Sequence, residues 1–171
     1  VTHSVGKRWL ENEQRGSIIS ILATWVWTGS AFVVPSAMSK SGIHAMTQSL
    51  AVEWGKTGVR INAIAPGPFP TEGAWSRLTP NQDVELTSPD SNYNQNPMGR
   101  VGKMEELGNL ATFLMSDGCD YLNGQTIALD GAEYLTGGTF RHLSSLTDSD
   151  WESIRDSIKK TNQKDKAKRT V

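Results

Sequence analysis

The sequence predicts an α/β fold, in which three parallel strands form one sheet with helices on both faces. Short apolar runs rich in β-branched residues lie at 17–23, 59–65 and 124–131. Stretches with helical apolar spacing lie before and between them, so the order is helix, strand, helix, strand, loop, helix, strand. This alternation is typical of parallel strands joined by right-handed crossovers.

The bulk properties narrow the class of protein. The 171 residues are enough for one domain with a core, and 17 basic against 18 acidic residues do not favour nucleic acid as a partner. Cys119 is the only cysteine, which excludes an internal disulfide, fits a reducing compartment and suggests the cytoplasm. No apolar run reaches the ~18 residues of a membrane span.

The first elements follow from spacing and from glycine positions. Residues 1–15 are predicted to be the end of an amphipathic helix, which Gly16 closes. The run at 17–23 should then be a strand buried on both faces. Residues 24–34 combine aromatic and small side chains and are expected to be a loop.

A long helix should begin near Pro35, because proline fits the first turn of a helix. It should end at Gly55, and the strand from Val59 to Ala65 should stop at Pro66. The apolar face of this helix is expected to comprise Ile43, Met46, Leu50, Ala51 and Trp54.

The remaining chain divides into a long loop, a helix, a strand and a tail. Residues 67–103 hold five of the seven prolines, and so long a loop suggests a cover for a substrate. Residues 104–115 should be helical, and 124–131 should form the third strand and its exit turn. We assign 1–140 to one domain and 141–171 to a polar tail with a short helix, frayed from Lys159 onward.

Two features point to a ligand site. Ser36 and Lys40 are four residues apart on one helix face, where an ammonium beside a hydroxyl can bind a ribose diol. Pro66-Gly67 ends a predicted strand, and open α/β sheets bind ligands at the carboxyl ends of their strands. Taken separately, the lysine could be an ordinary surface residue and the Pro-Gly pair a plain loop.

Five segments together resemble the C-terminal half of the short-chain dehydrogenase/reductase family, over residues 1–140. They are Ser39-Lys40, Arg60 to Gly67, Gly99 to Gly102, Phe113 to Asp117, and Gly124 to Gly131. The resemblance implies half of a doubly wound (Rossmann) sheet. It also implies that Lys40 binds the nicotinamide ribose, that Pro66, Gly67, Pro68 and Phe69 line the nicotinamide, and that Thr71 lies by the pyrophosphate.

The same resemblance implies partners that the chain does not contain. The family's glycine-rich phosphate loop does not precede residue 16, so we expect that the N-terminal half of the protein is missing here. The residues that read the adenine ribose would lie in that half, and we favour NADPH over NAD. Family members suggest a homotetramer packed through the helix at 36–55.

Two departures from the family pattern narrow the subfamily. Ser36 stands where the family has its usual catalytic tyrosine, and Ala23 stands where it has the catalytic serine. The runs Ser30 to Ser36 and Pro66 to Leu78 resemble 2,4-dienoyl-CoA reductases, which carry serine at the position of Ser36. In these enzymes the arginine that matches Arg77 binds the CoA part of the substrate. The alternative is that Arg77 is an ordinary solvated arginine on a loop.

The resemblance implies hydride transfer from the nicotinamide to a dienoyl-CoA thioester in fatty acid β-oxidation. Some of these reductases hold the thioester with a tyrosine, and that position is Trp25 here, which donates a hydrogen bond but shuttles no proton. We therefore predict Lys40, Ser36 and Thr24 as catalytic residues, with Arg77, Ser36 and Trp25 against the substrate. The proton donor is a bound water, Thr24 or a residue of the missing half.

Two other functions stay open. The chain could belong to a carbonyl or alcohol dehydrogenase of the same family, against which the missing tyrosine argues. It could also be an inactive fragment or relative that acts by binding a partner, which Ala23, Trp25 and the missing phosphate loop favour. His3, His44 and His142 show no metal-ligand spacing, and Asn62 is expected to be a structural amide inside its strand.

Overall fold

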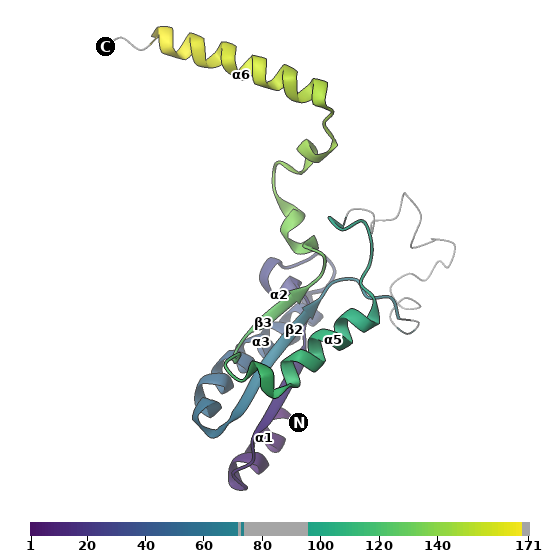
Figure 1. Cartoon of the computed structure of the whole chain (residues 1–171), viewed down its shortest axis with the longest axis vertical. Coiled ribbons are helices and arrows are strands. Elements are labelled where there is room, and N and C mark those ends of the chain that lie inside the picture. Colours follow the sequence, from purple (N-terminus) through teal and green to yellow (C-terminus); the bar gives the residue numbers. More distant parts are fainter. Residues whose placement is uncertain (72, 74–95, 169–171) are drawn as a thin grey trace. The chain divides into compact units, whose positions relative to one another are not determined.

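A sheet of three parallel strands organises the first of two compact units, Val1–Thr136 (Figure 1). The computed structural model describes residues 1–71, 73 and 96–168. Within them the strand order is β1-β2-β3, where β1 is Gly16–Ile21, β2 is Val59–Pro66 and β3 is Thr126–Leu129. The prediction of three parallel strands is confirmed.

The pairing of the strands aligns their carboxyl ends. Ile21 at the end of β1 pairs with Ile64 of β2, and Pro66 at the end of β2 pairs with Leu129 at the end of β3. Because all three strands run the same way, the segments that follow them leave the sheet at one edge. We call this the carboxyl edge; it is the edge at which such sheets bind ligands.

The central strand forms the core of the unit. Seven of the eight residues of β2 are buried, and Ile61 and Ile64 are fully inaccessible, as expected for a strand covered on both faces. β1 differs from the prediction, because its residues are only half-buried and Ile21 is 46% exposed. Within the described residues β1 has a strand neighbour on one side only, so its outer side is less covered.

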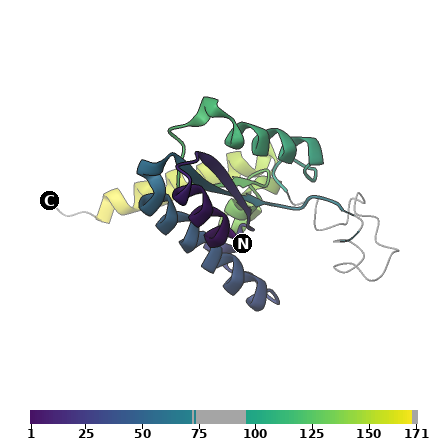
Figure 2. The same cartoon turned by 90° about the horizontal axis from the view of Figure 1, so that it is seen from below.

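Helices cover both faces of the sheet, as predicted (Figure 2). α1 (Thr2–Glu11) and α3 (Val34–Trp54) lie on one face, and α5 (Met104–Met115) lies on the other. α3 carries Pro35 in its first turn and buries Thr47, Ala51 and Trp54. α5 has the predicted bounds.

Two local predictions are wrong. α1 ends at Glu11 and Gly16 is the first residue of β1, where the Trp9 ring covers it too closely for a side chain. The predicted loop at 24–34 contains a one-turn helix, α2 (Trp25–Thr28). The third strand and its exit turn lie within the predicted range: β3 has four residues, and the backbone is left-handed at Gly124 before it and at Gly131 after it. Two 3₁₀ turns, η1 (Gly55–Thr57) and η3 (Asp117–Cys119), follow α3 and α5.

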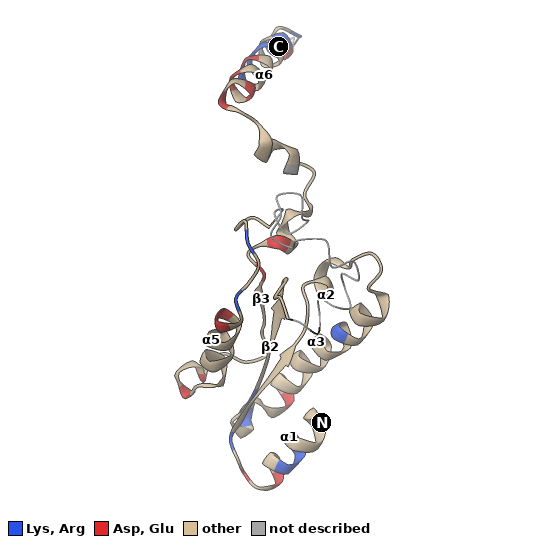
Figure 3. Ribbon diagram, turned by 90° about the vertical axis from the view of Figure 1, so that its right-hand side faces the viewer, with Lys and Arg blue, Asp and Glu red and all other residues tan. Residues whose placement is uncertain are grey.

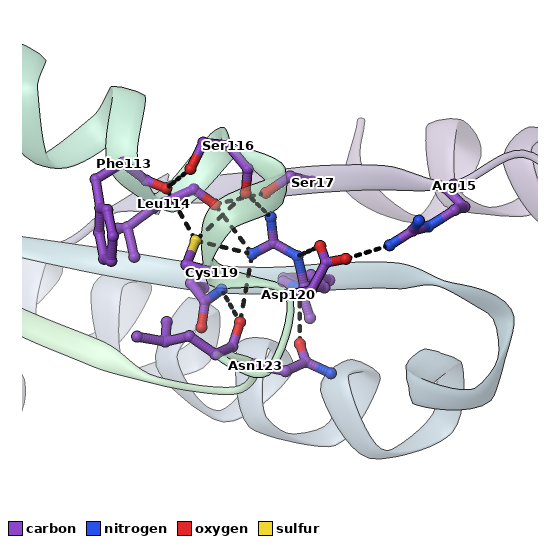
Figure 4. Close-up of polar contacts among 12 residues, drawn as sticks. Arg15, Ser17, Phe113, Leu114, Ser116, Cys119, Asp120 and Asn123 are labelled. Carbon is purple, nitrogen blue, oxygen red and sulfur yellow. Dashed lines mark hydrogen bonds and ion pairs between the residues drawn. The ribbon is translucent and has the colours of Figure 1, made fainter.

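A buried arginine, Arg60, ties α5 to the amino end of β2, and Figure 4 labels its partners Leu114, Ser116 and Asp120. The guanidinium of Arg60, which is 8% exposed, donates to the carbonyls of Leu114 and Ser116 at 3.0 Å and to Leu122 at 3.4 Å. Its Nε lies 3.5 Å from Asp120 Oδ1. The charge is therefore paired, and carbonyls at the end of α5 obtain donors that the helix itself cannot supply.

Asn62, two residues after Arg60 in β2, is also fully buried. Its Nδ2 donates to Leu122 O at 2.9 Å, and its Oδ1 accepts from Gln125 N at 3.0 Å. The prediction that Asn62 is a structural amide is confirmed. It aligns the segment that leads into β3.

The second unit, Gly137–Val171, contains η5 (Arg141–Ser145) and α6 (Asp148–Lys168), while η4 (Glu133–Gly137) follows β3. The prediction of a short tail helix that frays from Lys159 is wrong, because α6 has 21 residues. Thr147 and Asp150 cap its start reciprocally: Thr147 N donates to Asp150 Oδ2 at 2.9 Å, and Asp150 N donates to Thr147 Oγ1 at 3.3 Å.

Charges of both signs extend along α6 (Figure 3). Asp148 and Asp150 lie in its first turn, and Lys166 and Lys168 lie in its last. This order complements the helix dipole, so it favours a helix that continues to Lys168. The domain boundary that we predict at residue 140 stays a prediction.

Candidate active site

The Lys40 ammonium lies at the carboxyl edge of the sheet. Its Nζ donates to the carbonyl oxygen of Ile21, the last residue of β1, at 2.5 Å. α3 packs against β2, and Lys40 lies little more than one turn after Pro35, near the start of this helix. Its side chain therefore reaches the carboxyl edge. Lys40 is half-buried, so its aliphatic stem is covered while the ammonium meets the strand end.

Ser36 lies one turn before Lys40 on α3 and is also half-buried. Residues four apart in a helix share a face, so the structure keeps the two side chains on one side of α3, as the sequence predicts. The carbonyl of Ser36 accepts a hydrogen bond from Ser39 Oγ at 3.1 Å. A hydroxyl and an ammonium are therefore presented together beside the end of β1.

Thr24 and Trp25 continue the chain from the same strand end. The two residues between them and β1, Leu22 and Ala23, are buried and anchor the segment. Thr24 is the N-cap residue of α2, and its carbonyl accepts from Trp27 N at 3.1 Å. Both predicted residues, Thr24 and Trp25, are half-buried at the carboxyl edge.

Trp27 packs α2 against α3 and against η4, the turn that follows β3. Its ring lies edge-on to His44 at 6.2 Å and tilted against Tyr134 at 5.3 Å. His44 Nδ1 in turn lies 2.9 Å from Thr126 Oγ1. Sequence reasoning missed this cluster, because its members are separated by up to about a hundred residues and share no spacing pattern.

The Pro-Gly segment that follows β2 forms the second wall of the carboxyl edge. Gly67 N donates to Leu129 O at 3.0 Å, which extends the pairing of β2 and β3 by one residue. A methyl group on Gly67 would lie 2.8 Å from Asp130 Cα, so only glycine fits there. Pro68 O accepts from Gly102 N at 3.0 Å, and the Phe69 ring lies directly over Gly102.

A buried amide, which sequence reasoning also missed, supports this wall from behind. Asn96 is 5% exposed and donates through Nδ2 to Asp130 O at 2.8 Å. Asp130 accepts from Ala132 N at 3.0 Å and from Tyr134 N at 2.9 Å, which fixes the turn after β3. A lone asparagine in a polar loop gives no sequence signal of burial.

A pocket of about 250 Å³ opens between the ends of β2 and β3 and the start of α5. Its lining comes from 68–69, Asn96, Met98, 100–102 and 129–131, together with Glu106. Arg100 makes a bidentate pair with Glu106 at 2.7 and 2.9 Å. The pocket includes Pro68 and Phe69 but not Lys40 or Trp25, which lie on the β1 side.

Glu106 is held as an anion. Hydrogen bonds from Arg100 and from Lys103 N lower the pKa of its carboxyl group to about 2. The Lys103 N–H lies 2.9 Å from Glu106 Oε2, so the same carboxylate also satisfies an N–H at the start of α5. Glu106 therefore stabilises the helix that lines the pocket.

Two predicted residues lie at the margin of the described part of the chain. Thr71 is exposed, five residues after Pro66. Arg77 lies outside the described residues, as does most of the predicted substrate loop at 67–103. Across the described ranges no group of three or more His, Cys, Asp or Glu side chains could hold a metal ion. No helix in those same ranges is long and apolar enough to cross a bilayer.

The donors at the carboxyl edge suit a ligand that carries hydroxyl and carbonyl oxygens. Lys40 has three N–H groups, and the bond to Ile21 O uses one of them, so two remain for ligand oxygens such as those of a ribose diol. Gly67 keeps the backbone of the second wall free of side chains. These residues therefore fit the nicotinamide end of a dinucleotide.

Comparisons with known proteins agree with this architecture. Residues 1–132 match the family model described as enoyl-(acyl carrier protein) reductase. A probable 2,4-dienoyl-CoA reductase ((3E)-enoyl-CoA-producing) of Caenorhabditis elegans is 41% identical over 98% of this chain and 54% of its own length. A probable 2,4-dienoyl-CoA reductase ((2E)-enoyl-CoA-producing) of Bacillus subtilis is 39% identical over 78% of this chain and 52% of its length.

Solved structures of short-chain dehydrogenases share the fold of this chain. A short-chain dehydrogenase from Bacillus anthracis superposes with a TM-score of 0.66 at 38% identity, covering 80% of this chain and 50% of that one. A putative 2-deoxy-D-gluconate 3-dehydrogenase from Agrobacterium tumefaciens with bound NADP superposes with a TM-score of 0.67 at 27% identity, over 78% and 52%.

The chain spans about half the length of the curated relatives and solved structures that it matches. The match covers the sheet, its helices and the segment that ends in Pro66-Gly67. The family model accounts for most of the chain, and the relatives share its fold. This chain therefore belongs to the enoyl-(acyl carrier protein) reductase family of short-chain dehydrogenases/reductases.

Proposed function

We propose that the full-length protein is an NAD(P)H-dependent reductase of 2,4-dienoyl-CoA thioesters in fatty acid β-oxidation. The observation that carries the proposal is the Lys40 ammonium at the carboxyl edge, beside a strand that ends in Pro66-Gly67. The relatives that are 41% and 39% identical, both named as probable 2,4-dienoyl-CoA reductases, support the substrate class.

NADPH is the cofactor that we propose, which the NADP-bound Agrobacterium structure supports. Lys40 would hold the ribose next to the nicotinamide, the segment Pro66–Phe69 would lie along the ring, and Thr71 would lie near the pyrophosphate. When bound, this cofactor supplies a hydride. The part of the relatives that this chain does not match would hold the other end of the dinucleotide.

The chain's own residues would bind and polarise the thioester. Reduction of a conjugated dienoyl group places negative charge on the thioester oxygen, and preorganised donors beside that oxygen stabilise the charge. Ser36 and Trp25 are the donors that we propose for the substrate, with Arg77 for the CoA phosphates. Thr24 would hold the water that returns a proton, because a serine hydroxyl at position 36 is a weak acid.

A second function, reduction of a simple carbonyl, is favoured by the gluconate dehydrogenases among the structural neighbours. Ser36 argues against this second function, because reduction of a simple carbonyl needs a proton donor stronger than a serine hydroxyl at the reacting oxygen. We rank it below dienoyl-CoA reduction for that reason. A non-catalytic role through partner binding is the third possibility.

The decisive experiment measures NADPH oxidation by the full-length protein with a 2,4-dienoyl-CoA, and with simple ketones for comparison. Lys40→Ala should lower kcat/KM by about 10–100-fold, which corresponds to the loss of charge-assisted hydrogen bonds of about 1.5–3 kcal/mol. Lys56→Ala is the matched control, because Lys56 is an exposed lysine on η1, at the opposite end of α3. Undiminished activity in Lys40→Ala would end this assignment.

We also propose a homotetramer that packs through α3, and a cytoplasmic location. Met38 and Val52 on α3 are 72% and 85% exposed, which supports an apolar contact with another copy. The single cysteine, Cys119, is buried and free, which is compatible with a reducing compartment.

A further inference from the structure

We propose that α6 pairs with α6 of a second copy of this chain, side by side and in opposite directions. The inference goes beyond the proposed reaction and rests only on the proposed assembly of copies. It starts from the distribution of charge along the helix. The first half of α6, 148–158, holds four acidic residues and one arginine, whereas the second half, 159–168, holds five lysines and one aspartate.

Three apolar side chains form a narrow seam in the acidic half of α6. Trp151, Ile154 and Ile158 are spaced by three and four residues, so they lie on one face of the helix. Trp151 and Ile154 are half-buried, and Ile158 is 53% exposed. No residue of α6, from Asp148 to Lys168, is buried. The helix therefore has an apolar face that a partner can still cover.

The charges beside this seam select the partner. A second α6 that runs in the opposite direction places its basic half against the acidic half of the first, and a two-fold axis gives both copies the same contact. A parallel pair would instead place like charges together. A membrane surface fits less well, because helices that bind anionic lipids carry lysines beside their apolar residues, and here acidic residues accompany the seam.

The seam also fixes the register of the pair. Two antiparallel helices share most apolar surface when Ile154 of one copy lies opposite Ile158 of the other. In this register Asp150 of one copy lies beside Lys164 of the other, and the symmetry repeats this contact once. The same arrangement that joins the apolar residues therefore also joins opposite charges.

Residues near the middle of the pair meet their own copies. Ser157 lies beside the two-fold axis on the edge that also carries the contacts of Asp150 with Lys164. Arg155 meets its own copy on the other edge. Glu152 lies three residues earlier on the same helix as Arg155, so it offsets part of the repulsion between the two arginines.

The contact is too weak to hold two free chains together. It covers three apolar side chains from each copy, and isolated helices of this length are marginal in water. Copies that are already joined by the proposed contact through α3 raise the effective concentration of one α6 for the other. Pairing of α6 therefore follows assembly, and its loss should leave the mass of the protein unchanged.

Single cysteines in α6 of the full-length protein test this arrangement, because Cys119, the one cysteine of this chain, is buried. Ser157→Cys places a thiol beside the axis, so a short bis-maleimide should join two copies. Ser153→Cys is the matched control, since the predicted pairing places Ser153 on the outer face and about 9 Å along the axis from its own copy. After subtraction of the wild-type background, Ser157→Cys should give about five- to tenfold more cross-linked dimer.

Reversal of one charge tests the direction of the helices. In the Ser157→Cys background, Lys164→Glu places like charges beside Asp150 at both symmetric contacts, so it should lower the yield of cross-linked dimer about three- to tenfold. Lys166→Glu is the matched control, because Lys166 lies outside the predicted contact, and it should keep the yield. An equal fall in both variants, or a fall in neither, would overturn the antiparallel arrangement.

Sedimentation velocity on the same samples separates this inference from the proposed assembly. If the protein is assembled but Ser157→Cys links no better than Ser153→Cys, as it would if α6 docked on the body of a copy, the pairing of α6 is refuted while assembly through α3 stands. If wild type is a monomer, the proposed assembly fails and the pairing fails with it. The turnover assay with a dienoyl-CoA tests the proposed reaction independently of both.

Discussion

Gly67 shows how one residue shapes the carboxyl edge. A methyl group there would lie 2.8 Å from Asp130 Cα, and a backbone atom cannot yield as a flexible side chain can. We expect Gly67→Ala to lower the free energy of unfolding by about 1–3 kcal/mol through overpacking. Urea denaturation of wild type and variant measures the difference.

Gly108 provides the matched control for this substitution. It lies inside α5, and a methyl group on it would meet nothing within 4 Å. Gly108→Ala should therefore raise the free energy of unfolding by about 0.5–1 kcal/mol, since alanine favours the helix. Equal effects of the two substitutions would show that the close approach of Gly67 to Asp130 does not limit stability.

At the residue scale, the sequence predicts the positions of Lys40 and Ser36 because helical spacing fixes which side chains share a face. It predicts that Asn62 is satisfied because a buried strand cannot hold an unpaired amide. It does not predict the burial of Asn96, or that Trp25 Nε1 is buried with no hydrogen-bond partner among the described residues. Those depend on contacts between segments that are distant in the chain, and no periodicity encodes them.

At the element scale, α5 depends on a charged cap at its first turn. Glu106 accepts from Lys103 N and from Arg100, and these bonds lower the pKa of its carboxyl group to about 2. A carboxyl group whose pKa is lower in the folded state contributes stability above its ordinary pKa, and the contribution is lost as the pH falls towards about 2. The cap should therefore no longer stabilise α5 in acid.

Glu106→Gln tests this dependence on pH. The variant should be less stable than wild type at pH 7, and the difference should shrink between about pH 4.5 and pH 2, where wild type loses its anion too. Urea denaturation over this pH range measures the difference. Glu105→Gln is the control: its side chain is exposed in the same turn of α5, and its difference from wild type should not follow this course.

Element boundaries could be predicted only where a local signal decides them. α5 begins and ends as expected, while the proline and glycine signals place α3 to within a residue. The sequence predicts a helix end at Gly16, but this residue begins β1, and the Trp9 ring fills the space that a side chain there would need. α6 continues beyond its apolar residues, since caps and dipole charges support a polar helix that an apolar pattern does not reveal.

At the scale of the whole molecule, one face of α3 carries an unpartnered apolar stripe. Met38, Ala45 and Val52 recur every seven residues and are all exposed, Val52 to 85%. A seven-residue repeat keeps one seam facing a second helix. The stripe therefore supports the proposed assembly through α3.

Val52→Glu should break that assembly, because a buried charge without a partner is costly. The expected result is a drop in the mass of the full-length protein by at least half in sedimentation velocity. Ile158→Glu, which places the same charge at a residue of α6 that is 53% exposed, should leave the mass unchanged. A monomeric wild-type protein would contradict the proposal outright.

The overall architecture could be predicted because it follows from the order of elements, which the apolar patterns report well. Three parallel strands with helices on both faces match the prediction, and the family comparisons agree with it. The half-buried β1 could not be predicted, because the pattern of a strand is the same whether one neighbour or two lie beside it.

The close approach of Gly67 to Asp130 also limits how this protein can change over evolutionary time. No side chain fits at position 67, so this position cannot contribute to a new ligand preference. Selection removes point mutations there because they destabilise the fold. The one-turn helix α2 lies at the same edge, and its residues already carry side chains. Directed evolution of ligand preference would therefore vary residues 24–28 and leave 66–67 untouched.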